Sequence, residues 1–277
     1  MKNQLIRSLT GIVYIAIITL SVICSRYTFF ALFTLTTFLC LWEFYRLINI
    51  HKGMNINPYI YAGGGAALFL SFFLHTSGIV GHSIFSLYFL FILGAFIYEL
   101  YAKEKQPIVR LSFIFFGQCY LALPFSLLNL LAFPNMTANI PIYHWNWIIV
   151  LFIFLWANDT GAYLIGVQFG KHRLLERISP KKSWEGAFGG LIFAIAAALI
   201  LAHFNQQIAW YHWIVLSAAV AVAGVYGDLF ESLIKRTLEV KDSGDSLPGH
   251  GGFLDRFDSF LLAVYVLLFY IQFFIQS

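Results

Sequence analysis

Long apolar runs recur along the whole of this chain. Each is about 20 residues long, which is the length that an α-helix needs to cross ~30 Å of hydrocarbon. The runs lie at about 9–25, 28–48, 58–77, 83–102, 110–133, 147–169, 187–204, 212–233 and 259–276. We therefore expect an all-α polytopic membrane protein with about nine transmembrane helices.

The composition excludes an ordinary soluble domain. Of the 277 residues, 60% are hydrophobic and only 11% are charged, and the mean hydropathy is +0.78. Cys24, Cys40 and Cys119 lack the spacing of a disulfide framework or a zinc site. Basic residues precede the first run as in a signal peptide, but no small-residue cleavage pattern follows Cys24, so we expect this run to be retained.

The basic residues predict the orientation of the chain. If the N-terminus is cytoplasmic, all of the 17 Lys and Arg residues except Arg26 fall on the cytoplasmic side of the nine expected spans. Cytoplasmic loops of membrane proteins carry this positive excess. We therefore expect the N-terminus inside and the C-terminus outside, with a cytoplasmic face suited to anionic lipids and anionic substrates.

Polar chemistry is sparse in the first half of the chain. We expect residues 1–150 to be a scaffold of helices with possible dimer contacts, and residues 151–277 to carry the functional site. In the third run, Gly63, Gly64 and Gly65 predict close helix approach or a break. For Glu43 and Glu99 we expect local pairing with Arg46 and Lys103, respectively.

The second half places polar residues inside or beside its spans. Asn158 and Asp159 lie within an apolar run, followed by small residues at every fourth position, namely Ala162, Gly166 and Gly170. Such a stripe allows another helix to pack closely. Farther on, polar residues share one helical face because they recur at intervals of three and four. They are Asp228, Glu231, Ser232 and Lys235.

Ionisable residues are densest between Ser232 and Ser259, where both signs of charge occur with five Gly or Pro residues. We expect a tight loop over 249–252, whose backbone N–H groups approach a ligand. Carboxylates from separate segments suit a hard divalent cation, usually Mg²⁺, and the adjacent Lys and Arg residues suit phosphate oxygens. This combination indicates phosphoryl or nucleotidyl transfer.

Plainer interpretations stand beside this one for several residues. Asp258 fits a capped helix start as well as it fits a metal ligand. His250 fits a structural hydrogen bond better than a base or a phosphate donor. Lys171, Arg173 and Arg177 also fit topology-determining charges that touch anionic headgroups, and for Arg177 we prefer that interpretation.

The motifs of 156–259 resemble those of the phosphatidate cytidylyltransferases, or CDP-diacylglycerol synthases. The strongest is Ser232-x-x-Lys235-Arg236-x4-Lys241-Asp242, followed by Pro248-Gly249-His250-Gly251-Gly252-x-x-Asp255-Arg256-x-Asp258. Three further blocks match in order: Asn158-Asp159-x-x-Ala162-Tyr163, Ser179-Pro180-Lys181-Lys182-x-Trp184-Glu185-Gly186 and Gly227-Asp228-x-x-Glu231-Ser232. Ser183 stands where threonine is usual in the family, and Ser246 where an aliphatic residue is common.

This resemblance implies transfer of CMP from CTP to phosphatidic acid, which gives pyrophosphate and CDP-diacylglycerol, the activated precursor for phospholipid biosynthesis. It further implies Mg²⁺, and in this family K⁺ as well, a homodimer, and a bacterial inner (plasma) membrane with the active site facing the cytoplasm. The partners are CTP, phosphatidic acid and the lipid bilayer, with no nucleic acid.

The resemblance also implies roles for individual residues. The expected catalytic residues are Asp228, Lys235, Arg236, Lys241, Asp242, Asp255 and Arg256. The expected substrate-binding residues are Asn158, Ser179, Lys181, Lys182, Ser232, Gly249, His250, Gly251 and Gly252. The expected metal ligands are Asp159, Asp228, Asp242 and Asp258. The phosphatidate oxygen is already a nucleophile, so no activating Ser/His pair is required.

Three other functions compete with this one. A CDP-alcohol phosphotransferase would carry an Asp-Gly-x-x-Ala-Arg block, which this sequence lacks. A polyprenol or dolichol kinase has nearer chemistry and differs in its nucleotide and its lipid acceptor. A secondary transporter often consists of two related halves, whereas the polar residues here crowd into one half.

Overall fold

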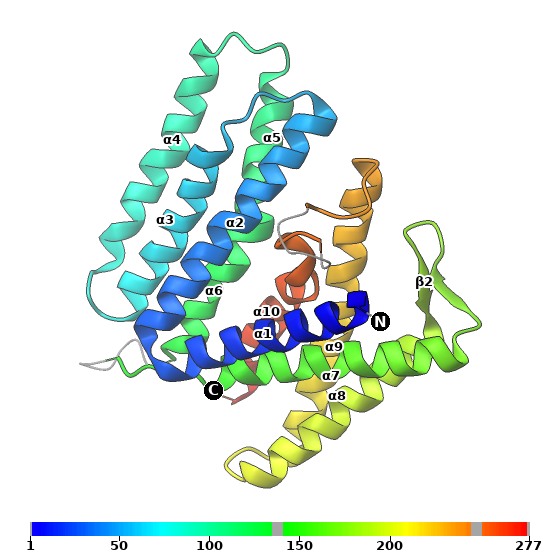
Figure 1. Cartoon of the computed structure of the whole chain (residues 1–277). Coiled ribbons are helices and arrows are strands. Elements are labelled where there is room, and N and C mark those ends of the chain that lie inside the picture. Colours follow the sequence, from blue (N-terminus) through cyan, green and yellow to red (C-terminus); the bar gives the residue numbers. More distant parts are fainter. Residues whose placement is uncertain (1, 135–140, 245–250, 276–277) are drawn as a thin grey trace. The chain divides into compact units, whose positions relative to one another are not determined.

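The computed structural model describes residues 2–134, 141–244 and 251–275, with side chains from residue 10 onward (Figure 1). Helices dominate the described residues. The first part of the chain contains α1 Lys2–Cys24, α2 Arg26–Lys52, α3 Pro58–Thr76, η1 His82–Ile84, α4 Phe85–Tyr101, α5 Pro107–Gly117, the π-helical turn η2 Gln118–Ala122, and α6 Leu123–Ala132. The second part contains α7 Asn146–Phe169, β1 Arg173–Leu175, β2 Ser179–Ser183, α8 Trp184–Phe204, α9 Trp210–Thr237, η3 Leu254–Arg256, α10 Asp258–Tyr270 and η4 Ile271–Ile275.

Seven helices of the described residues are long and apolar enough to cross a membrane. They coincide with seven of the nine expected spans, and one of them joins α5, η2 and α6 into a single segment, Pro107–Ala132. The other two expected spans coincide with α1, whose apolar part Thr10–Cys24 is shorter, and with α3. A polytopic helical membrane protein is therefore confirmed, while the number nine and the orientation of the termini stay predictions.

The chain divides into two compact units. Unit 1 comprises Met1–Trp145 and Leu238–Arg256, and unit 2 comprises Asn146–Thr237 and Phe257–Ser277. The segment 238–256, which carries much of the expected signature, thus belongs with the first helices rather than with α7 to α10. Each unit is described by itself below.

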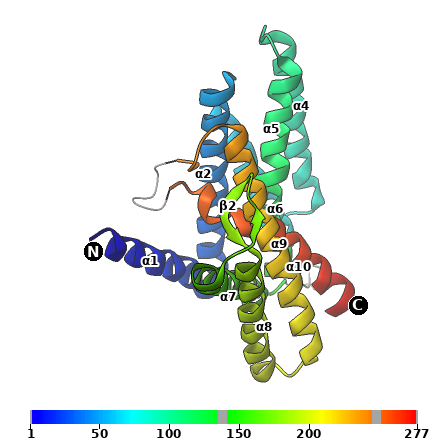
Figure 2. The ribbon, with the colours of Figure 1, turned by 90° about the vertical axis from the view of Figure 1, so that its right-hand side faces the viewer.

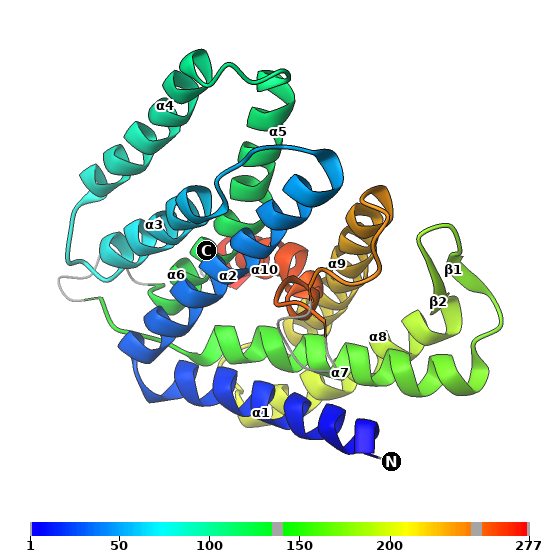
Figure 3. The same ribbon diagram turned by 45° about the horizontal axis from the view of Figure 1, so that its top comes forward.

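Local signals in the sequence set the helix starts of unit 1. The Ser25 hydroxyl accepts a hydrogen bond from Tyr27 N and begins α2, and α1 leaves α2 at a steep angle at this point (Figure 3). The Asn57 side chain accepts hydrogen bonds from the first backbone N–H groups of α3, where Pro58 occupies the first helical position. These are the residue types that cap helices most effectively.

The glycines of α3 confirm the predicted close approach of helices. A Cβ on Gly64 would overlap the ring of Phe91 on α4, and a Cβ on Gly65 would overlap Leu41 on α2. The third helix therefore packs directly on both neighbours, and α3 continues as an unbroken helix through the three glycines.

The local pairing predicted for Glu43 and Glu99 is wrong. Glu99 forms a buried ion pair with Arg110 of α5, with Oε1 2.7 Å from Nε, and Arg110 also contacts Glu104. Glu43 accepts hydrogen bonds from the 243–254 segment, and the Arg46 guanidinium lies over the Trp42 ring instead. A hydrogen bond or ion pair in the protein interior is stronger than an ion pair between solvent-exposed neighbours on one helix. Each buried acid therefore pairs with a residue that is distant in the sequence.

Unit 2 is built on the close contact of α7 with α8. Gly186 approaches Ala162 O and Gly166 Cα so tightly that a Cβ on it would lie 3.0 and 3.2 Å from them. The small-residue stripe predicted on α7 is therefore confirmed as a packing face. The two helices α8 and α9 then run side by side, with α10 against α9 (Figure 2).

Candidate active site

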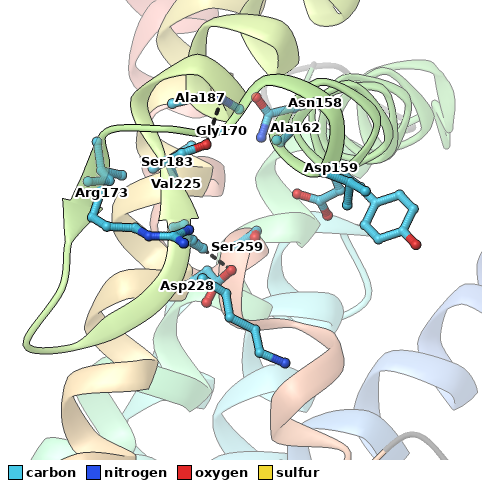
Figure 4. A pocket seen from close by; sticks show the side chains of 17 residues that line it. Asn158, Asp159, Ala162, Gly170, Arg173, Ser183, Ala187, Val225, Asp228 and Ser259 are labelled. Carbon is cyan, nitrogen blue, oxygen red and sulfur yellow. Dashed lines mark hydrogen bonds and ion pairs between the residues drawn. The ribbon is translucent and has the colours of Figure 1, made fainter.

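A cavity of about 640 Å³ opens in unit 2. Its walls come from α7, the β1–β2 hairpin, the first turn of α8, the middle of α9 and the start of α10 (Figure 4). Small residues of the α7–α8 interface form part of the lining, namely Ala162, Gly166, Gly170 and Gly186. The close helix contact thus leaves room for a ligand beside it.

Carboxylates from three helices lie in or near this cavity. Asp159 of α7 and Asp228 of α9 line it, and the Asp159 carboxylate points toward the side where Asp228 and Ser259 lie (Figure 4). Asp258 at the start of α10 is close enough to interact electrostatically with both of these acids and with Lys182. Three of the four expected metal ligands are therefore neighbours within one unit.

Basic side chains reach the same cavity from the β-hairpin. Arg173 of β1 and Lys181 and Lys182 of β2 line it, and Lys182 Nζ lies 2.5 Å from Asp228 Oδ2. Arg173 thus lines the cavity, and its role as a topology-determining charge stays a prediction beside this. Opposite charges from separate elements therefore face one open cavity.

The connection expected to be a turn at Ser179–Gly186 is an antiparallel hairpin followed by the start of α8. Hydrogen bonds of two side chains join the hairpin to the start of α8. The Glu185 carboxylate accepts hydrogen bonds from Lys171 N and His172 N and lies 2.6 Å from His172 Nδ1, while Ser183 Oγ accepts one from Gly186 N. Ser183 thus caps α8, a task for which the hydroxyl of serine serves as well as that of threonine.

The polar face predicted on α9 is present. Ser232 Oγ lies 3.3 Å from Asp228 Oδ1, and Lys235 Nζ lies 3.0 Å from Oε2 of the fully buried Glu231. Arg236 donates to Ile178 O in the hairpin turn. Ser232 and Lys235 are therefore tied to the acids of their own helix. Like Arg236 and Ser179, neither lines the cavity.

Asn158 lies between two neighbouring cavities of unit 2. Its side chain is buried, with 2% of its surface exposed, and its Oδ1 atom accepts no hydrogen bond from the described part of the chain. Gly190 of α8 leaves space for this amide, since a Cβ there would lie 2.5 Å from Oδ1. The residue lines the polar cavity and also a neighbouring apolar one.

The rest of the signature belongs to unit 1, where a buried network shapes it. Asp255 Oδ2 accepts hydrogen bonds from Ser243 N, Ser243 Oγ and Gly252 N, at 2.9, 2.9 and 2.8 Å. Gly251 has φ +81°, a conformation that favours glycine, while the first two residues of the tight loop expected over 249–252 lie outside the described residues. Asp255 thus joins Ser243 to Gly252.

Glu43 holds part of the expected signature within unit 1, a role that the sequence interpretation did not give it. It lies on α2, is 4% exposed, and its Oε2 accepts hydrogen bonds from Ser243 Oγ at 3.2 Å and Leu254 N at 2.9 Å. Gly244 and Gly252 press so closely against its carboxylate that neither has room for a Cβ. The available signal was a single acid within an apolar run, since such residues are rarely without a buried partner.

The other expected residues of this segment are placed as follows. Lys241 and Asp242 are exposed, and Arg256 is half-buried, with its carbonyl accepting a hydrogen bond from Tyr14 of α1. Gly249 and His250 lie outside the described residues, as does Ser246. Asp242 belongs to unit 1 and Asp159, Asp228 and Asp258 to unit 2.

The donor set of unit 2 has the chemistry that Mg²⁺ requires, because carboxylate oxygens are the ligands that this ion prefers. Across 2–134, 141–244 and 251–275, however, no three His, Cys, Asp or Glu side chains are already gathered as a metal site. In particular, Lys182 and a metal would compete for Asp228 Oδ2. The acids are therefore electrostatic neighbours, and one of them is already paired with Lys182.

Several known proteins are similar in sequence to this chain. A protein of Haemophilus influenzae named phosphatidate cytidylyltransferase is 47% identical over 122 residues, which is 42% of each chain. One of Bacillus subtilis with the same name is 32% identical over 193 residues, or 69% of this chain and 68% of that protein. One of Staphylococcus saprophyticus is 44% identical over 120 residues, or 43% of this chain and 46% of that protein.

These alignments cover less than half of two of the three relatives and about two thirds of the third. The sequence model of the cytidylyltransferase family, in contrast, matches nearly the whole chain, from residue 5 to residue 274. Because that match includes α1 and α10 as well as the polar cavity, the chain belongs to the cytidylyltransferase family.

Proposed function

We propose that this protein transfers CMP from CTP to phosphatidic acid, giving CDP-diacylglycerol and pyrophosphate. The observation that carries the proposal is the cavity of unit 2, where acids of α7 and α9 face basic residues of the hairpin within a membrane-spanning bundle of this family. A nucleoside triphosphate and an anionic lipid repel each other. A site that joins them needs such cations and metal ligands beside apolar helices.

The reaction requires little covalent chemistry from the protein. An oxygen of the phosphatidate monoester attacks the α-phosphorus of CTP and forms a new P–O bond. The bond from that phosphorus to the bridging oxygen of the β-phosphate breaks, and pyrophosphate leaves with the electron pair. The attacking oxygen is already anionic, so that positioning and neutralisation of charge supply the rate enhancement.

Arg173, Lys181 and Lys182 are the cations that line the cavity, and we assign them to the phosphates. Arg173 offers a planar fork of donors suited to two phosphate oxygens, whereas the lysines act as point charges. Lys182 is held by Asp228 at 2.5 Å and would exchange this carboxylate for a phosphate oxygen when the nucleotide binds. That exchange would free Asp228 for a cation.

Mg²⁺ would be held by Asp228, with Asp258 and Asp159 as its neighbours, and would neutralise the triphosphate and polarise the α-phosphate. Asp242 remains the proposed further ligand, and K⁺ a proposed second ion. Lys235, Arg236, Lys241 and Arg256 are assigned to the triphosphate or the lipid phosphate. We also propose a homodimer in a bacterial inner membrane, with the site on the cytoplasmic side.

The proposal is tested with purified full-length protein, labelled CTP, Mg²⁺ and phosphatidic acid. We expect label from the cytidine to appear in a lipid and label from the γ-phosphate in pyrophosphate. Label passing from the γ-phosphate to a lipid would instead indicate a kinase. If CDP-diacylglycerol formed only from CMP and a phospholipid, the protein would instead be a CDP-alcohol phosphotransferase acting in reverse. No transfer at all would overturn the proposal.

Asp228→Asn tests the site within that assay. This change keeps the shape of the side chain and removes the charge that binds a cation, so that turnover should fall on the order of 100-fold or more. Asp242→Asn should lower turnover in the same way. Glu176→Gln is the matched control, because Glu176 is an exposed acid in the hairpin turn of unit 2 and does not line the cavity.

A further inference from the structure

A second cavity of about 370 Å³ adjoins the polar one in unit 2. It lies along α8 and α9, and the two cavities share Asn158, Leu174, Ala187 and Val225 in their walls. Apart from Asn158, its lining consists of aliphatic and aromatic residues. A polar compartment and an apolar one therefore meet across a common wall.

The apolar compartment is open along the surface of two membrane-spanning helices. The large side chains at its rim are half or more exposed, with Trp184 at 50%, Phe188 at 58% and Tyr226 at 60%. We call this compartment the α8–α9 groove. Its floor is made of smaller residues such as Ala187, Ala221 and Val225, so that a slender chain can lie between the rings.

We infer that the α8–α9 groove holds an acyl chain of the phosphatidate substrate. This inference rests on the proposed function and names a binding subsite for the lipid acceptor. A phosphatidate molecule carries a dianionic headgroup joined through glycerol to two apolar chains, and the paired cavities match this division. With the phosphate beside Arg173 and Lys182, the glycerol reaches the shared wall and one chain continues into the groove.

Because the groove adjoins the polar cavity, an acyl chain bound in it also affects the binding of the phosphate. Burial of apolar surface stabilises a bound chain in proportion to its length, so a chain held there helps to position the phosphate. A lipid with shorter chains buries less apolar surface in the groove but keeps the contacts of its headgroup. The groove thus predicts selectivity for long acyl chains that arises in the binding of phosphatidate and not of CTP.

Val222→Trp tests the inference because Val222 lines the groove and is 49% exposed. The matched control is Val215→Trp, two turns earlier on α9, with an exposure of 50% and no place in either cavity. With purified full-length protein in lipid nanodiscs, V222W should raise KM for dioleoyl phosphatidate about tenfold. Its KM for CTP should stay unchanged, its KM for dioctanoyl phosphatidate should rise by a smaller factor, and V215W should behave like the unmodified protein.

Photolabelling of the unmodified protein supplies a test that does not depend on folding of the variant. A phosphatidate with a diazirine in the middle of one acyl chain should crosslink to α8 and α9 residues at the rim, such as Trp184 and Tyr226, and excess dioleoyl phosphatidate should suppress the label. Equal effects of V222W and V215W in an active enzyme, or labelling spread evenly over all spans, would overturn the inference. Absence of CMP transfer by the unmodified protein would instead overturn the proposed function.

Discussion

At the scale of single residues, Glu43 shows how a buried carboxylate can organise a distant segment. Its Oε2 atom accepts hydrogen bonds from Ser243 Oγ and Leu254 N. Its carboxylate also occupies the space that a side chain at Gly244 or Gly252 would need. Asp255 supplies a second carboxylate to the same segment through Ser243 and Gly252. Two acids from different parts of the chain therefore bind the described residues on either side of 245–250.

Glu43→Ala should destabilise this segment. The change leaves Leu254 N buried without its acceptor, which costs about 1–3 kcal/mol, whereas the Ser243 hydroxyl keeps Asp255 Oδ2 as its acceptor. Glu43→Gln keeps one oxygen that can accept both bonds, so that we expect the order unmodified, Gln, Ala in stability. Limited proteolysis within 238–256 and thermal inactivation in detergent measure the effect.

Glu176→Ala provides the comparison for Glu43→Ala, because it removes an exposed acid outside this network. Turnover should follow the same order as protection of the segment if Glu43 acts by positioning it. If Glu43→Ala left cleavage within 238–256 and turnover unchanged, the buried carboxylate would have no organising role.

At the scale of elements, the α7–α8 contact is the frame of the candidate site. Its closest points are glycines, and the polar cavity opens beside them. Gly189 lies at the centre of the contact, where a Cβ would be 2.5 Å from Ile165 Cβ and 3.0 Å from Gly161 O. The spacing of the two helices is therefore set by the absence of side chains at these positions.

Gly189→Ala should force α7 and α8 apart. Overpacking of this kind typically costs about 1–3 kcal/mol, and the midpoint of thermal inactivation should fall accordingly. Gly94→Ala is the control, since Gly94 lies in α4 with nothing within 4 Å of an added Cβ. There alanine should be neutral or stabilising by about 0.5–1 kcal/mol, because glycine weakens a helix interior. Equal midpoints for the two variants would contradict a tight α7–α8 contact.

What the sequence predicted at this scale follows from regular patterns. Apolar length located the helices, the interval of four found the packing stripe of α7, and the intervals of three and four found the polar face of α9. Partners separated by many residues leave no such pattern. The bonds from Glu43 to Ser243 and from Lys182 to Asp228 each join different elements, and their distance along the chain carries no periodicity.

The β-hairpin illustrates the same limit. A Ser-Pro-Lys-Lys run is rich in turn-forming residues and predicts a loop. Its strands instead form because Glu185 and Ser183 anchor the C-terminal end of the hairpin at the start of α8 and Arg236 reaches the Ile178 carbonyl from α9. Tertiary contacts thus decide the local conformation and bring Arg173, Lys181 and Lys182 to the cavity.

At the scale of the whole molecule, the distribution of basic residues predicts how the chain crosses the membrane. All 17 Lys and Arg residues except Arg26 fall on one side if there are nine spans. Within the part of the chain that the structure describes, seven helices satisfy the criteria of length and apolarity, and α1 and α3 coincide with the remaining two spans of the prediction. Seven and nine are both odd, and an odd number of spans places the N-terminus and the C-terminus on opposite sides of the membrane.

Reporter fusions decide the orientation. Alkaline phosphatase fused to the C-terminus should be active, because this enzyme folds only outside the cytoplasm, whereas a green fluorescent protein fused there should be dark. The same reporters inserted into the hairpin turn between Leu175 and Ser179 should give the opposite result, since α8, α9 and α10 separate this turn from the C-terminus by an odd number of crossings. The hairpin carries three cavity cations, so a cytoplasmic turn places them on the side where CTP is available. Phosphatase activity in the turn would reverse the orientation and leave the cavity without its nucleotide.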